Sequence, residues 1–415
     1  MSPSSPNSAK LHPKAWLVLA LNALYNIAES LCSVFVSMYF YVNSLDFRVV
    51  CYHYLALYLV TPVVFIFAGW YAKTRDRVHV FRIGLALHAV YYGALLWFRE
   101  DSANHAVPLG ILLGVTWGFF WAGNNTFQFD FSTLERRDYY LGLISTVSGA
   151  SRLVGPLLSG LIIGLAPRAE MGYRALFAGA LCLYLAAIAM SMAVPHGRTR
   201  KPFHLRPALL PPPEHRDWRL VMLASATLAG SFHIFHFVLA LIMFLRTGSE
   251  INVGGFVSAQ GLVGVVAAYV VGRWVTRRTR KASMLAGTLC LLAGGGLIAW
   301  RLDLVTLIIF GFLRSLSEPL FGIPHTGIRF DAMQRTAAPE DRIEYLAAWE
   351  VPLALGRLVT MTLLIGLFTL LGEAGLRVTL MVVSSYRVAT YLLLRRISFV
   401  ADPALLSEPA GNART

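Results

Sequence analysis

The segment that decides the organisation of this chain is Pro195–Trp218, which reads PHGRTRKPFHLRPALLPPPEHRDW. It is rich in proline and in basic residues. Each proline removes a backbone donor and clashes with the preceding turn, so this density of proline cannot continue a helix. Apolar runs long enough to cross a bilayer lie on both sides. We therefore expect this segment, called the bridge below, to be a solvent-side linker between two membrane-embedded halves.

The composition is that of a membrane protein. Of 415 residues, 56% are hydrophobic and 14% are charged, which excludes an ordinary soluble protein. A transmembrane helix needs about 20 apolar residues. Before the bridge we expect spans at about Ala15–Tyr41, Val49–Ala72, Phe81–Phe98, Val107–Phe129, Tyr139–Leu165 and Tyr173–Val194. After it we expect spans at about Leu220–Leu245, Val253–Val275, Ala282–Trp300, Leu304–Ile328, Ile343–Leu371 and Leu376–Leu394.

These runs predict an all-α, polytopic protein with twelve transmembrane helices. Two six-helix bundles would cover residues 15–194 and 219–396, joined by the linker 195–218, with tails at 1–14 and 397–415. Lys and Arg concentrate in alternate loops, for example in 73–82 and 277–281, and in the bridge. By the positive-inside rule these loops and both tails are cytoplasmic. We expect a monomer in the cell inner membrane, with its first span retained and lipids around it.

The net charge of +14 follows mostly from this loop bias. Nucleic-acid binding is the competing explanation, but the basic residues are scattered among membrane loops, so no nucleic-acid partner is expected. Cys32, Cys51, Cys182 and Cys290 stand singly, without metal spacing or a disulfide framework. The sequence has no nucleotide-binding phosphate loop and no nucleophile–base pattern. We therefore expect neither a cofactor nor enzymatic activity.

The two halves show weak internal similarity, which is typical of transporter folds. Gly69-Trp-Tyr-Ala-Lys-Thr-Arg-Asp-Arg follows the second span, and Gly272-Arg-Trp-Val-Thr-Arg-Arg-Thr-Arg-Lys follows the eighth. Phe129-Asp130 ends the fourth span and Phe330-Asp331 ends the tenth. Ser151-Arg152-Leu153-Val154 corresponds to Gly356-Arg357-Leu358-Val359. The matches occur in the same order in both halves.

Two six-helix halves, a long bridge and a glycine-then-basic loop after spans two and eight resemble the major facilitator superfamily. Lys73 stands where the family usually has an acidic residue, and Asp76 lies three residues further on. The fifth span is similar to the antiporter signature of that superfamily, with Gly142, Ser151, Gly155-Pro156 and Ser159-Gly160. The resemblance implies an exporter or antiporter.

The same resemblance implies a gate at the cytoplasmic helix ends, made by contacts between basic and acidic loop residues. The residues expected there are Gly69, Arg75, Arg77, Asp130, Gly272, Arg277, Arg278 and Asp331. Exposed ion pairs contribute only about 0–1 kcal/mol each, so such a gate can open in every cycle. The alternative is that these charges are simply solvated.

Ionisable groups within the spans are costly in the bilayer and therefore mark functional positions. Glu29 lies near the middle of the first span, on a polar stripe with Asn22, Asn26 and Ser33, of which we expect Asn26 to contact substrate. A buried carboxyl group with few partners suits the uptake and release of protons near neutral pH. We expect Glu29 to couple transport to protons; a structural ion pair is the alternative.

The seventh span contains His233 and His236, three residues apart. Histidine titrates near physiological pH. We expect His233 to take part in proton coupling and His236 to contact substrate. Interhelical hydrogen bonds are the simpler alternative. A metal site is a further one, although the local sequence offers no third ligand.

The tenth span places Arg314, Glu318 and His325 on one face, beside Pro319 and Pro324. Irregular backbone at membrane depth is tolerated where it lines a cavity. We expect these three side chains to bind substrate. Alternatively, Arg314 and Glu318 form an internal ion pair one turn apart.

Arg152 in the fifth span has no acidic neighbour in its own helix, and arginine keeps its proton, so an anion must lie opposite. Glu29 and an anionic substrate group are both candidates. We expect Arg152, and Arg357 in the eleventh span, to bind substrate. Arg357 has Glu350 two turns away, and Glu350 is another candidate for proton coupling. The fourth span would add Trp117, Trp121 and Asn124 to the substrate site, although the tryptophans would equally serve helix packing.

The sequence therefore predicts a secondary transporter that moves a small charged or amphipathic organic solute by alternating access, with proton-coupled export preferred. Proton-coupled uptake is the main alternative. A membrane sensor or assembly partner that does not transport would have a sealed, apolar centre. A flippase for a lipid-linked substrate would have a lateral opening and a cavity with one apolar side.

Overall fold

The computed structural model describes residues 13–130, 137–195, 197, 201–232, 234–276, 278–338 and 341–397. The regular structure in this part of the chain is entirely helical. The first half contains α1 (Pro13–Ser44), α2 (Phe47–Thr74), α3 (Arg77–Phe98), the 3-10 helix η1 (Arg99–Ala103), α4 (Ala106–Asp130), α5 (Arg137–Gly164) and α6 (Ala169–Ser191). The bridge contains α7 (Leu205–Leu209). The second half contains α8 (Arg216–Phe232), α9 (Ile234–Thr247), α10 (Glu250–Trp274), α11 (Arg280–Trp300), α12 (Leu304–Thr336), α13 (Arg342–Leu371) and α14 (Glu373–Leu394).

The all-α, polytopic fold class predicted from the sequence is confirmed. Among the described residues, 11 helices are long and apolar enough to cross a membrane, with α8 and α9 together forming the span Arg216–Thr247. Helix α14 falls outside that set and contains Glu373, Arg377 and Arg387. It nevertheless packs against α8, α11 and α13 as the sixth helix of its half.

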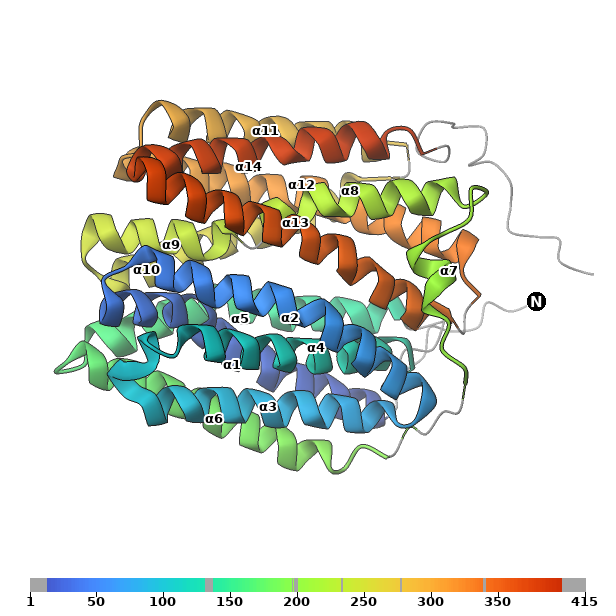
Figure 1. Ribbon diagram of the computed structural model, residues 1–415, viewed down its shortest axis with the longest axis horizontal. Coiled ribbons are helices and arrows are strands. Elements are labelled where there is room, and N and C mark those ends of the chain that lie inside the picture. Colours follow the sequence, from blue (N-terminus) through green and yellow to red (C-terminus); the bar gives the residue numbers. More distant parts are fainter. Residues whose placement is uncertain are drawn as a thin grey trace, which may run out of the picture.

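The halves repeat one packing pattern, visible as two stacked groups of helices in Figure 1. In the first half α1 contacts α5 and α6, α3 contacts α4 and α6, and α2 contacts α4. In the second half α8 contacts α13 and α14, α11 contacts α12 and α14, and α10 contacts α12. Each pair in one half has its counterpart in the other. The contacts between the halves repeat too, because α5 packs on α10 and α2 packs on α13.

Glycines permit the close approach of α5 to its neighbours. A Cβ atom on Gly155 would lie 2.3 Å from Ser30 Oγ of α1, and one on Gly160 would lie 2.5 Å from the carbonyl oxygen of Glu250 in α10. Ser159 Oγ donates a hydrogen bond to the carbonyl of Leu31, at 2.8 Å. The residues that resemble the antiporter signature thus let α5 pack closely against α1 of its own half and against α10 of the other half.

The bridge is more than a solvent-exposed linker. Trp218 is fully buried and its indole Nε1 donates a hydrogen bond to Ala208 O at 2.9 Å. Helix α7 packs on α13. Ala208 and Trp218 also share an apolar cluster with Leu394 and Ile397 at the end of α14. The apolar residues of the bridge therefore pack against helices of the second half at one end of the molecule. We call this end the bridge end and the opposite end the distal end.

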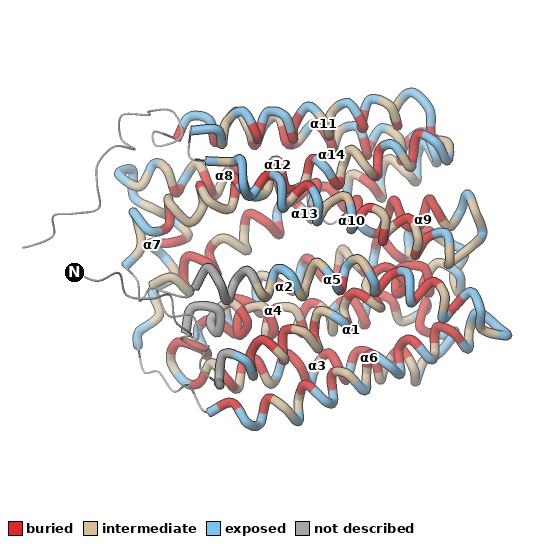
Figure 2. Tube along the Cα trace, turned by 180° about the vertical axis from the view of Figure 1, so that it is seen from behind, coloured by how far each residue is buried: buried red, intermediate tan, exposed pale blue. Residues whose placement is uncertain are grey.

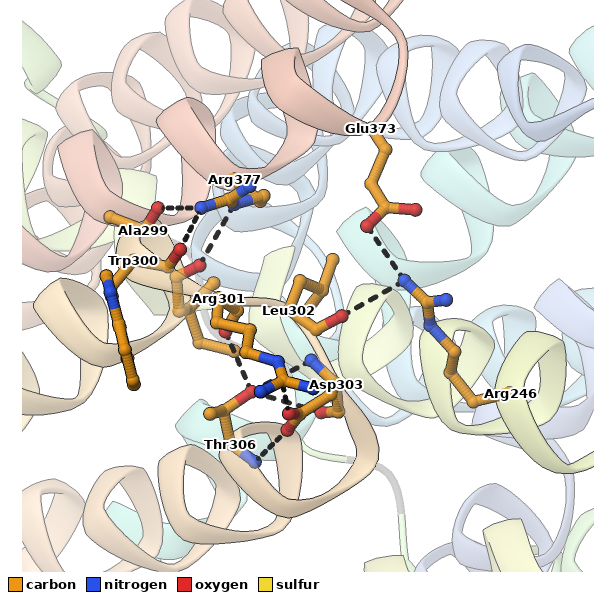
Figure 3. A network of polar contacts seen from close by, with 10 residues as sticks. Arg246, Ala299, Trp300, Arg301, Leu302, Asp303, Thr306, Glu373 and Arg377 are labelled. Atoms are coloured by element: carbon orange, nitrogen blue, oxygen red, sulfur yellow. Dashed lines mark hydrogen bonds and ion pairs between the residues drawn. The ribbon is translucent and has the colours of Figure 1, made fainter.

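A polar network at the distal end fastens the helices of the second half (Figure 3). Arg246 of α9 donates to Leu302 O at 3.1 Å and pairs with Glu373 of α14 at 2.8 Å. Arg377 of α14 donates to carbonyl oxygens at the end of α11, those of Ile298, Ala299 and Trp300. A cation at the C-terminus of a helix satisfies carbonyls that lack partners and opposes the helix dipole. The network therefore joins α9, α11 and α14.

Buried residues gather where helices face one another, and exposed residues lie on the outer faces (Figure 2). Many exposed side chains are large and apolar, including Leu59, Val63, Val266 and Val305. Scattered exposed apolar residues are common in soluble proteins, but here they occur on long apolar helices. This surface is suited to contact with lipid.

Candidate functional site

The centre of the molecule brings together three side chains from both halves. Arg152 of α5 and Arg314 of α12 both interact electrostatically with His236 of α9 and with each other. The guanidinium group of Arg314 lies over the ring of Phe235, 5.8 Å from its centroid. Arg152 lies where α5 crosses α10, because a Cβ atom on Gly261 would be 3.0 Å from Arg152 O. We call Arg152, His236 and Arg314 the central cluster.

The central cluster makes no ion pair within the described residues, although Glu318, one helical turn from Arg314, interacts electrostatically with it. Arg152, in the middle of α5, and His236, in the first turn of α9, are exposed, and Arg314 is half-buried. Neither arginine makes a hydrogen bond or an ion pair with any part of the chain that the structure describes. Guanidinium groups at membrane depth normally have an anionic partner. A ligand from outside the chain would supply one.

Glu318 pairs with Arg387 of α14, not with Arg314. Arg387 Nη2 lies 2.5 Å from Glu318 Oε2, and Arg387 Nη1 donates to Ser317 O at 3.0 Å. The Arg387 side chain is 2% exposed. The internal Arg314–Glu318 ion pair considered above is not formed, because α14 brings a cation to the other side of Glu318. Arg387 was not predicted, although a lone arginine in an apolar span is the signal that marked Arg152.

Arg357 and Glu350 of α13, two turns apart, form an ion pair, with Arg357 Nη1 3.4 Å from Glu350 Oε2. Arg357 also lies over the ring of Tyr58 in α2, 5.7 Å from its centroid, and therefore at the contact between the halves. A crevice too narrow to hold a water molecule lies here, lined by residues of α2, α8, α9 and α13. Arg357 is one of its lining residues.

Arg329 of α12 is a further cation that the sequence interpretation missed. It interacts electrostatically with Glu350. Its guanidinium group lies 3.9 Å from the ring centroid of Trp349 and 4.9 Å from that of Phe330. The predicted tenth span ends at Ile328, one residue before Arg329. The longer α12 places it within the bundle.

Glu29 lies inside the first half and is surrounded by aromatic side chains. It interacts electrostatically with tyrosines of α1, α2, α3 and α6, which are Tyr25, Tyr54, Tyr91, Tyr92 and Tyr184. Within the described ranges Glu29 makes no hydrogen bond and no ion pair. The Glu29–Arg152 pair considered above is therefore not formed. Glu29 is a carboxyl group among hydroxyl groups, without a fixed cation.

Two buried histidines, which were not predicted, adjoin these tyrosines. His53 Nδ1 lies 2.9 Å from Ala106 O, and its Nε2 lies 3.4 Å from the Tyr91 hydroxyl. His88 stacks on Tyr184 with ring centroids 4.7 Å apart, and its Nδ1 lies 2.8 Å from Gly84 O. Histidine in an apolar span is the signal that would have found both.

The remaining predicted substrate residues are mostly engaged within their own half. Asn26 Nδ2 donates to Asn22 O at 2.7 Å, so its amide is satisfied in α1. Trp121 packs edge-on against Tyr25 at 5.9 Å, and Trp117 and Asn124 lie on the same helix, α4. His325 is buried in α12 beside Phe321, with ring centroids 6.3 Å apart. His233 lies outside the described residues.

At the bridge end, Lys73 of α2 joins the two halves. Its Nζ lies 3.0 Å from Asp341 Oδ1 and also pairs with Glu344 of α13, whose side chain is fully buried. Gly69, one turn earlier, faces Ile343, Ala347 and Phe203, and a Cβ atom there would lie 3.8 Å from each. Lys73, which stands where the family usually has an acidic residue, thus pairs with acidic residues of the other half.

The other predicted gate residues differ in their contacts. Asp331 pairs with Arg280 at 2.6 Å, between α11 and α12 of one half. Arg77 lies beside Gly197 of the bridge. Arg75 and Arg278 are exposed, and Gly272 has open space around it. The side chain of Asp130 and the whole of Arg277 lie outside the described residues.

Comparison with known proteins places the fold in a family. A sequence model described as Major Facilitator Superfamily matches residues 8–323. The chain belongs to this superfamily. Uncharacterized protein YqgE of Bacillus subtilis (strain 168) is 27% identical over 384 residues, covering 92% of this chain and 89% of that protein. Uncharacterized protein in sodM 3'region of Geobacillus stearothermophilus is 33% identical over 147 residues, covering 35% of this chain and 69% of that protein.

Solved transporters share the architecture. A peptide transporter POT in complex with sulfate matches with a TM-score of 0.69 at 14% identity, covering 94% of this chain and 95% of that chain. A bacterial homologue of the iron transporter ferroportin, in its inward-facing state, matches with a TM-score of 0.69 at 15% identity, covering 95% and 100%. The human organic anion transporter MFSD10 (TETRAN) matches with a TM-score of 0.64 at 15% identity, covering 92% and 100%. At these identities the likeness shows the fold alone. Family and fold together make this protein a multi-pass membrane transporter of the secondary type.

Proposed function

We propose that this protein exports a small charged or amphipathic organic solute across the cell inner membrane in exchange for protons. The observation that supports this most is the position of the central cluster. Arg152 comes from one half, Arg314 and His236 come from the other, and neither arginine makes an ion pair within the described residues. A site shared by two repeated halves at mid-membrane is the arrangement that alternating access requires.

The contacts between the halves supply two gates. At the bridge end Lys73 pairs with Asp341 and Glu344. At the distal end the rings of Phe47 in α2 and Phe368 in α13 lie 4.7 Å apart. Helices α2 and α13 therefore touch at both ends, with Arg357 and Tyr58 between. Opening one end while the other stays closed would expose the centre to one side of the membrane. The bridge end would face the cytoplasm.

Glu29 is the proposed proton-coupling residue. It is separate from the central cluster but joined to it through packing, because Tyr54 stacks on Phe237 of α9 with ring centroids 4.4 Å apart. Phe237 is the neighbour of His236. The tyrosine hydroxyls and the buried His53 and His88 would carry the proton to and from Glu29. A change in the charge of Glu29 would act on α9 through Tyr54, and so on the solute site.

The first test identifies the solute. An untargeted metabolite comparison of cells with and without the protein should show a solute that accumulates inside cells lacking it. Purified protein in proteoliposomes should then exchange labelled and unlabelled forms of that solute. The site residue Arg314 is the matched test position, since Arg314→Gln should abolish exchange while Arg273→Gln, on the exposed side of α10, should not. If no solute differs and none exchanges, the transport proposal fails.

The direction is tested with the same vesicles. Export by antiport predicts that the solute enters inside-out vesicles when their interior is acidic. If instead the solute moves with the protons, in the same direction, the protein performs uptake by symport and the export part of the proposal is wrong.

A further inference from the structure

The charges inside the second half do not balance. Away from the bridge end, where the buried Glu344 pairs with Lys73, its interior carries Arg314, Arg329, Arg357 and Arg387, which are opposed by Glu318 and Glu350. Glu318 is paired with Arg387, and Glu350 is paired with Arg357 and interacts with Arg329. Arg314 remains without an ion pair within the described residues. Arg152 of the first half, which interacts electrostatically with Arg314, adds another cation.

The repeat between the halves makes the imbalance clearer. Arg152-Leu153-Val154 and Arg357-Leu358-Val359 are equivalent stretches of α5 and α13. Arg357 has Glu350 seven residues before it. Counting seven residues back from Arg152 gives Ser145, which carries no charge. One arginine of the repeated pair therefore has an internal counter-ion and the other lacks one.

From these contacts we infer that the transported solute carries an anionic group, a carboxylate, phosphate or sulfate, which binds between Arg152 and Arg314. This rests on the proposed transport function and specifies its substrate class. Guanidinium groups are planar, always charged, and matched to the oxygens of these anions. His236 adds a ring nitrogen beside the two cations, and Phe235 supplies an apolar wall for the rest of the solute.

An anion in this position would also hold the two halves together. Arg152 belongs to the first half and Arg314 to the second, so bound anion would offset the repulsion between two cations that approach one another. Without the anion, that repulsion would favour separation of the halves. The anionic group of the solute would thus favour closure of the two halves around the solute.

The anion can be tested without knowing the solute. Purified protein in nanodiscs of zwitterionic lipid is titrated with sulfate, inorganic phosphate or succinate, and with tetramethylammonium as a cation of comparable size, at constant ionic strength. Melting temperature and intrinsic tryptophan fluorescence report binding. A parallel sample in nanodiscs containing phosphatidylglycerol tests whether a lipid headgroup supplies the anionic group. The variants are Arg152→Gln and Arg314→Gln, with Arg152→Lys and Arg314→Lys keeping the charge and Arg273→Gln as the control.

We expect at least one soluble anion to raise the melting temperature of the wild type and of Arg273→Gln, while tetramethylammonium does not. Each Arg→Gln variant should raise the Kd of that anion by about tenfold or more, since a charged hydrogen bond is lost. The Lys variants should retain part of the binding. Stabilisation by phosphatidylglycerol alone, lost in both Gln variants, would still support an anionic group and assign it to a lipid.

Three results would overturn the inference: binding of the cation, anion binding unchanged in both Gln variants, or no effect of any anion in the wild type. The wild-type comparison of anion with cation stands even where a variant fails to fold. Failure here would leave the transport proposal intact, because solute exchange in proteoliposomes is measured separately and does not depend on the sign of the solute's charge.

Discussion

Glu318 of α12 pairs with Arg387 of α14, with Nη2 and Oε2 2.5 Å apart, and this contact leaves Arg314 one helical turn away without an ion pair. Two cations thus compete for one carboxylate, and the packing of α14 decides between them. Arg387 is buried and makes further bonds to Ser317, so it serves to fix the structure. Arg314 borders the other half, and its charge remains available to a ligand.

Removal of Arg387 should therefore destabilise the protein. Arg387→Met would leave Glu318 without its cation, and breaking a buried pair costs about 3–5 kcal/mol; the lower value is expected because Glu318 is partly exposed. Thermal unfolding in detergent measures the loss. The double variant Arg387→Met/Glu318→Gln should recover most of it, and Arg273→Met should resemble the wild type. If the single and double variants unfold at the same temperature, loss of the Arg387–Glu318 ion pair does not explain the destabilisation.

The ion pair at the bridge end should control access to the centre. Lys73→Ala removes the cation shared by Asp341 and Glu344, so the bridge end should open more often. In a background carrying Cys182→Ser, a reporter Ala347→Cys opposite Gly69 should react faster with a membrane-impermeant maleimide when Lys73 is replaced. Arg273→Ala is the control. An unchanged labelling rate of Ala347→Cys would show that Lys73 does not control opening of the bridge end.

Because α5 packs closely on α10 at Gly160, a larger residue at this position should destabilise the protein. A Cβ atom there would meet the backbone of Glu250, and backbone cannot move aside as a flexible side chain can. Gly160→Val should lower the melting temperature and reduce transport. Gly179→Val on α6 is a matched control, since a Cβ atom at Gly179 has nothing within 4 Å. Similar behaviour of the two variants would contradict the interface described here.

The start of α12 should be sensitive to acid through Asp303. The backbone N–H of Thr306 donates to Asp303 at 2.8 Å, and this bond holds the pKa of the carboxyl below its ordinary value of 3.8. The folded pKa is lower than the unfolded one, so the stabilisation is present above about pH 4 and is lost as the pH falls through the folded value. Asp303→Ala should lower the melting temperature at pH 7, and its difference from the wild type should shrink in acid. Glu214→Ala in the bridge should show no such difference at either pH.

Hydropathy and the repeat were sufficient to predict the spans, because bilayer thickness fixes helix length and each half copies the other. The Arg357–Glu350 pair was also predictable, since it lies within one helix. Ion pairs between different helices were not predictable from the sequence. The spacing of Arg314 and Glu318 indicated one partner, whereas the position of α14 supplies another. Lys73 was read as a departure from the family pattern, and its carboxylate partners lie about 270 residues further along the chain.

The most direct test of proton coupling is the pH-driven accumulation of the identified solute in proteoliposomes of the Glu29→Gln variant. Glutamine keeps the shape and hydrogen-bonding capacity of the side chain but cannot exchange a proton. We expect solute exchange at equal pH to persist while accumulation under an imposed pH gradient is abolished, and Glu214→Gln to behave like the wild type. Accumulation by Glu29→Gln against the solute gradient at the wild-type rate would contradict the account.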